Sequence, residues 1–105
     1  MRDRAGVLLL FFDFPMTTKQ ERKKYTAFRK YLKRSGFFPL QESVYVKYLR
    51  NASSASREIE KIGHYATAEN RISVLALKIA EYLKMESFGS PPLDLSLFCD
   101  DVVAI

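Results

Sequence analysis

The order of segments along the chain predicts an α+β fold. An unbroken apolar run, Val7 to Phe12, is long enough for a β-strand that is buried on both faces. A helical pattern follows over residues 18 to 36, and strand and helix patterns then alternate to Leu77. In so short a chain this order predicts a ferredoxin-like sandwich, with two helices on one face of an antiparallel sheet. The other face needs a cover, which a homodimer would supply.

The first predicted strand ends in a carboxylate. Asp13 is followed by Phe14 and Pro15, and because proline lacks an N–H, strand pairing is expected to stop there. Alternation places Asp13 on the same face as Phe11 and opposite Phe12, at the strand's C-terminal end. A carboxylate there is a candidate for catalysis or metal binding, and the alternative is that Asp13 only begins the turn before the proline.

The first predicted helix has signals at both ends. Thr18 and Glu21 have the spacing of a capping box, and Gly36 is placed to end the helix in the left-handed conformation. Three large side chains share one stripe that is expected to be buried: Tyr25, Phe28 and Leu32.

The opposite side of this helix is basic. At about 100° per residue, seven cations fall within an arc of roughly 140°: Lys19, Arg22, Lys23, Arg29, Lys30, Lys33 and Arg34. Residues 1 to 50 carry 12 Lys and Arg against 4 Asp and Glu, whereas residues 51 to 105 carry 5 against 8. This imbalance favours a polyanionic partner, with a solvated basic surface as the alternative.

The rest of the chain gives weaker signals. Residues 37 to 49 contain Pro39 and predict either one bent strand or a hairpin, with one face in solvent. A second helix is expected at about 54 to 65, a strand at Ile72 to Leu77, and a short strand near Met85 to Phe88. We therefore expect one domain at 1–88 and a tail at 89–105 that docks on the dimer, as an edge strand or by exchange between protomers.

Composition excludes several classes of protein. With 105 residues and 48% hydrophobic content, there is room for one core. Cys99 is the only cysteine, so no internal disulfide can form and a reducing compartment is expected. No apolar stretch reaches the ~20 residues that cross a bilayer, which predicts a cytoplasmic protein with no membrane partner. There is no Gly-rich phosphate loop, zinc-type Cys pair or His-Glu-x-x-His motif.

Asp13 alone is a poor Mg²⁺ site. Mg²⁺ in proteins keeps several waters and is usually bound by one or two carboxylates together with phosphate oxygens. A twofold dimer could bring two copies of Asp13 together, and a nucleic-acid phosphate could complete the shell.

Three segments together resemble the CRISPR-associated Cas2 family, in the form found beside single-protein RNA-guided effector nucleases. They are FFDFP, the basic helix ERKKYTAFRKYLKRSGF and LQESVYVKYL. The resemblance implies a ferredoxin-like homodimer that bridges dimers of the CRISPR integrase Cas1 and binds duplex DNA during spacer acquisition. It also implies Mg²⁺-dependent endonuclease activity on RNA or DNA, with Asp13 as the catalytic and metal-binding residue.

The sequence leaves two functions open, a DNA adaptor and an RNA-binding module or ribonuclease. In the adaptor, the seven helix cations together with Lys47 and Arg50 would contact backbone phosphates without reading sequence. The alternative is a ferredoxin-like single-strand RNA-binding module or a ribonuclease unrelated to integration, with bases stacking on an exposed aromatic such as Tyr45.

Overall fold

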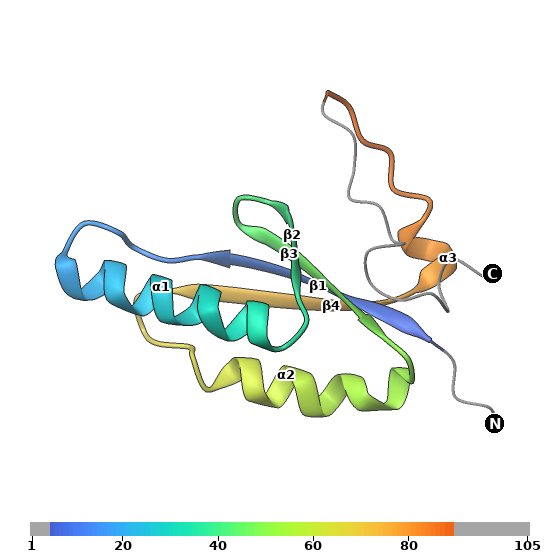
Figure 1. Ribbon diagram of the computed structural model, residues 1–105, viewed down its shortest axis with the longest axis horizontal. Helices are drawn as coiled ribbons and strands as arrows, with labels where there is room; N and C mark the ends of the chain where they lie inside the picture. The colour runs from blue at the N-terminus through green and yellow to red at the C-terminus, as the bar shows by residue number, and fades with distance from the viewer. Residues whose placement is uncertain (1–4, 90–105) are drawn as a thin grey trace.

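The computed structural model describes residues 5 to 89. Its elements are β1 (Gly6–Asp13), α1 (Lys19–Arg34), β2 (Phe38–Gln41), β3 (Val44–Leu49), the 3₁₀ turn η1 (Ala52–Ser54), α2 (Ala55–Gly63), β4 (Arg71–Lys78) and α3 (Ile79–Tyr82). The four strands form one antiparallel sheet in the order β2-β3-β1-β4, and α1 and α2 run along it (Figure 1). This is the topology of a ferredoxin-like sandwich, so the predicted α+β fold is confirmed.

β1 is paired on both sides. Leu9 lies opposite Val46 of β3 and opposite Leu75 of β4, so the backbone of the strand bonds to two neighbours. Leu8 and Leu10 are 0% exposed. The apolar run therefore forms the central strand expected from its composition.

The helices cover one face of the sheet. The core there contains Leu8, Leu10, Phe12, Phe14, Phe28, Leu32, Phe37, Tyr45, Leu49 and Ile62. Phe28 of α1 stands at its centre, with ring centroids 5.2 Å from Phe12 and 5.0 Å from Phe14. Tyr25 packs against this core while partly buried. The predicted apolar stripe of α1 is therefore confirmed.

The other face, called here the open face, is only partly covered. At the end where β1 begins, Val7, Leu9, Val46 and Tyr82 form a second small core under α3. Nearer the end where β1 stops, Phe11 is 40% exposed, and Leu75 of β4, opposite Leu9, is 49% exposed. The open face therefore has an apolar surface beside Asp13.

The structure resolves two expectations for the middle of the chain. Residues 37 to 49 form a hairpin of β2 and β3, with a register shift between Pro39 and Gln41. Proline cannot donate to the ladder, which accounts for a break at this edge strand. The second helix is shorter than predicted, and of its apolar residues Ile62 is buried while Ile59 is 39% exposed.

The strand predicted near Met85 to Phe88 is wrong. These residues lie outside any helix or strand, and the preceding residues form α3 instead. A helical turn places Ile79 and Tyr82, three positions apart, on one side, where both join the open-face core. Most of the predicted tail, residues 90 to 105, lies outside the described residues.

The ends of α1 form as predicted. Thr18 Oγ1 accepts the N–H of Glu21 at 3.0 Å, and Glu21 Oε1 accepts the N–H groups of Thr17 and Thr18, each at 2.9 Å. These backbone donors, that of Thr18 first, lower the pKa of Glu21. The chain leaves the helix through Gly36, whose φ of 90° favours glycine.

We expect Thr18→Ala to lower the free energy of unfolding by about 1 kcal/mol, because it removes the side-chain acceptor of the cap. Thr17→Ala is the matched control, since Thr17 takes part in the described bonds through its backbone. Urea denaturation of the two variants measures the difference. Equal stability of the two variants would contradict the capping assignment.

Candidate functional site

Asp13 lies at the exposed end of β1. It shares the open face with Phe11, while Phe12 and Phe14 turn toward the helices. Its cross-strand partner is Arg71, the first residue of β4. Directly opposed residues in an antiparallel pair point to the same face, so the side chains of Arg71 and Asp13 both start from the open face.

One chain supplies one carboxylate to the predicted metal site. Within residues 5 to 89, no group of three or more His, Cys, Asp or Glu side chains could hold a metal ion. Asp13 could provide one carboxylate ligand to Mg²⁺, and phosphate oxygens and water can provide other ligands. In a dimer, another copy of the chain would supply a second Asp13 carboxylate.

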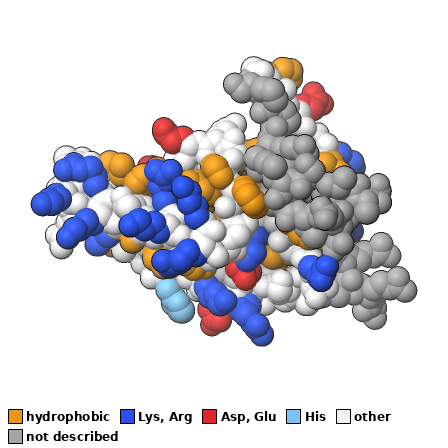
Figure 2. Space-filling view, viewed as in Figure 1, with side chains coloured by type: hydrophobic (Ala, Val, Ile, Leu, Met, Phe, Trp, Pro, Cys, Tyr) orange, Lys and Arg blue, Asp and Glu red, His pale blue; other side chains and the backbone are white. Residues whose placement is uncertain are grey.

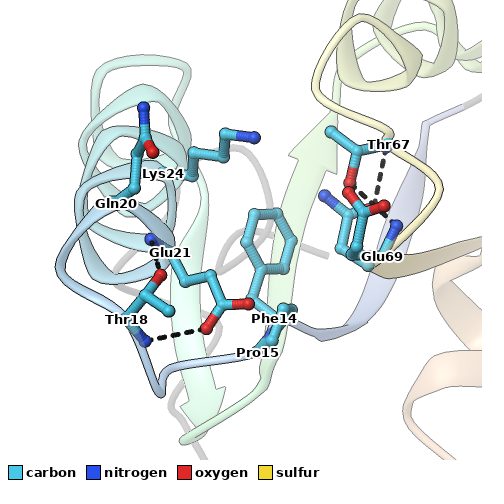
Figure 3. A pocket seen from close by; sticks show the side chains of 9 residues that line it. Phe14, Pro15, Thr18, Gln20, Glu21, Lys24, Thr67 and Glu69 are labelled. Atoms are coloured by element: carbon cyan, nitrogen blue, oxygen red, sulfur yellow. Dashed lines mark hydrogen bonds between the residues drawn. The ribbon is translucent and has the colours of Figure 1, made fainter.

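A cavity of about 240 Å³ lies beside the turn that follows Asp13, between the start of α1 and the loop before β4 (Figure 3). Its lining residues are Phe14, Pro15, Thr18, Gln20, Glu21, Lys24, Thr67, Glu69 and Asn70. Several of their polar groups bond within the wall itself: Glu21 caps α1, and Asn70 Oδ1 accepts the N–H of Thr67 at 3.0 Å. The hydrogen bonds of this cavity shape the two loops, and Asp13 does not line it.

The seven cations of α1 form a continuous exposed surface, called here the α1 band. Figure 2 shows Lys and Arg side chains gathered over this helix. A groove of about 400 Å³ along it is lined by Lys19, Arg22, Lys23, Thr26, Ala27 and Lys30. Arg22 also donates from Nη1 to the carbonyls of Met16 and Thr17, at 3.2 and 2.9 Å. The structure therefore brings the predicted helix cations together on one side.

Arg29 stands at the edge of this band with defined partners. Its Nε donates to the Tyr45 hydroxyl at 3.4 Å, a long hydrogen bond, and its Cζ lies 5.6 Å from the centre of the Tyr25 ring. The hydrogen bond to Tyr45 is the main cause of a raised pKa for Arg29. Sequence reasoning found Arg29 but missed these partners, although the i, i+4 spacing from Tyr25 was a usable signal.

Lys47 and Arg50 are placed apart from the band. Lys47 faces the helices, where its Nζ lies 3.0 Å from Glu58 Oε1 and 5.8 Å from the centre of the Phe37 ring. Its charge is thus already paired with a carboxylate. Arg50 follows β3, whose Leu49 lies opposite Gly6, so Arg50 lies at the other end of β1 from Asp13.

Tyr45 is not an exposed stacking platform. It is 2% exposed and packs in the helix-side core, with its ring centroid 5.6 Å from that of Phe12. Tyr45 therefore does not supply the exposed aromatic that the alternative, a single-strand RNA-binding module, would need. β3 alternates as predicted, and the helices cover the face that carries Tyr45 and Lys47.

Comparison with known proteins identifies the family to which the chain belongs. The model of the family described as CRISPR associated protein Cas2 matches residues 7 to 85. The chain belongs to the Cas2 family. A protein of Treponema denticola is 37% identical over 79 residues, which is 75% of this chain and 78% of the relative. A Flavobacterium psychrophilum protein is 31% identical over 92 residues, covering 87% and 80%.

Both Cas2 relatives carry the name CRISPR-associated endoribonuclease Cas2, as does one from Ligilactobacillus salivarius that is 36% identical over 78 residues, 74% of this chain and 77% of the relative. The matched region spans β1 to the residues just after α3 and so includes Asp13 and the α1 band. In the described part of this Cas2 chain, no helix has the length and apolar character to cross a membrane.

Proposed function

We propose that this Cas2-family protein is a homodimeric adaptor that binds duplex DNA and bridges Cas1 integrase dimers during spacer acquisition. The observation that carries the proposal is the α1 band, whose seven cations are all exposed on one side of α1. Such a surface suits the regularly spaced phosphates of a duplex, and contacts to phosphates position DNA without reading its sequence.

Dimerisation through the open face supports this function. Phe11 and Leu75 are large, exposed and close to the central strand, so a second copy would remove apolar surface from water. A twofold axis there would place the same surface of each protomer against the other and bring the two Asp13 residues toward each other. The α1 band lies on the helix side of the sheet and would stay exposed. In this proposal the tail, residues 89 to 105, docks on the dimer.

The adaptor should bind duplex DNA with a steep salt dependence. We expect affinity to fall by roughly 10³-fold or more between 50 and 200 mM salt if about six phosphates are neutralised. Fluorescence anisotropy with duplexes of unrelated sequence measures this. Lys19→Gln, Lys23→Gln and Lys30→Gln combined should weaken binding and reduce the slope of log K against log salt. Salt-insensitive binding, or strong preference for one sequence, would contradict the proposal.

Nuclease activity forms the second part of the proposal, and the names of the relatives support it. Two Asp13 carboxylates brought together would repel each other, which favours a dication between them. Mg²⁺ bound there would polarise a phosphate oxygen and lower the pKa of a bound water. Arg71, opposite Asp13 in the β1–β4 ladder, would add a positive charge to the open face near a bound phosphate.

Asp13→Asn should abolish cleavage of RNA or DNA while leaving dimerisation and duplex binding nearly unchanged. The amide keeps the size of the side chain but loses the charge that holds the metal. Gel-based cleavage assays with Mg²⁺, beside sedimentation and anisotropy, separate these properties, and Glu69→Gln is the control for loss of an exposed acid. Cleavage that survives in Asp13→Asn, or in excess chelator, would remove the catalytic assignment and leave the adaptor function standing.

A further inference from the structure

We infer that Arg29 binds one backbone phosphate of the duplex. The Tyr25 ring and the Tyr45 hydroxyl hold its guanidinium in position for this contact. The inference rests on the proposed duplex binding and deepens it. It separates Arg29 from the other cations of the α1 band, which are expected to act mainly through their charge.

The location of Arg29 supports this role. It lines a groove of about 430 Å³ between α1 and the β2–β3 hairpin, together with Tyr25, Pro39, Leu40, Gln41, Glu42 and Tyr45. Among these lining residues Arg29 is the one cation, and Glu42 is an acid. A phosphate at this groove therefore has to be bound through Arg29. The groove of the band itself, in contrast, has several cations that can replace one another.

The contacts of Arg29 use only part of its guanidinium. The Nε–H donates to the Tyr45 hydroxyl at 3.4 Å, and the Cζ atom lies over the Tyr25 ring, 5.6 Å from its centre. Bidentate pairing with phosphate can use the edge formed by the two terminal nitrogens. A side chain that is already held loses less conformational entropy when it binds, so its contact contributes more to affinity than that of a flexible lysine.

Tyr45 links this contact to the centre of the fold. Its ring is buried in the helix-side core, and its backbone lies opposite Leu10 of β1. A phosphate held by Arg29 would thus have a fixed position relative to β1 and to Asp13 at its end. The hydroxyl of Tyr45 is the atom through which the core sets the direction of Arg29.

Duplex binding by wild-type protein, four single variants and one double variant tests the inference. Arg29→Lys keeps the charge but lacks the Nε–H and the planar fork, and we expect it to weaken binding about tenfold while leaving the salt slope unchanged. Lys30→Gln removes a neighbouring charge and should cost less. Tyr45→Phe should weaken binding several-fold in the wild-type background and have no further effect in Arg29→Lys.

Tyr31→Phe is the matched control for loss of a hydroxyl. The Tyr31 hydroxyl is buried without a hydrogen-bond partner among residues 5 to 89, so its removal should leave binding unchanged. Thermal melts show whether each variant is folded. If wild type binds with a steep salt dependence but Arg29→Lys equals wild type, or Tyr45→Phe acts independently of Arg29, the inference is overturned. If wild type binds no duplex, the proposed function itself fails.

Discussion

The burial of β1 is the constraint on which the rest of this structure depends. The strand pairs with β3 and β4, and its alternating side chains enter two cores, a large one under α1 and α2 and a small one under α3. Successive side chains of a strand point to opposite faces. Because Leu8, Leu10 and Phe12 of β1 pack under the helices, Asp13 lies on the open face. The position of the carboxylate thus follows from the packing of apolar residues before it.

The two candidate functions lie on different sides of the sheet for the same reason. α1 buries Phe28 and Leu32 against the sheet, so its other cations face away from the sheet while Arg29 lies at the edge and bonds to Tyr45. The open face carries Asp13 with Phe11 and Leu75 beside it, and this is where a second protomer would dock. In the proposed adaptor, dimerisation and duplex binding would therefore use different surfaces of the protein.

The features predicted correctly from the sequence depend on local signals. The capping box of Thr18 and Glu21, the turn at Gly36 and the apolar run of β1 each arise from residues close together in the chain. The strand predicted near Met85 to Phe88 is absent, because a pattern of so few apolar residues does not specify a strand. The regular structure in this region is the helical turn of α3, whose Tyr82 is buried in the small core. The same limit applies to Tyr45, Lys47 and Arg71, whose surroundings depend on which face is covered and on strand register.

In the proposed dimer, two chains meet across the open face and bring their Asp13 residues to one metal. Crystals of the dimer grown with Mn²⁺, which shares the preference of Mg²⁺ for oxygen ligands, test it most directly through anomalous diffraction. We expect one anomalous peak on or near the twofold axis, within coordination distance of at least one Asp13 carboxylate or bridged to both by water. A dimer formed through another surface, with the two Asp13 residues far apart and no peak between them, would contradict it.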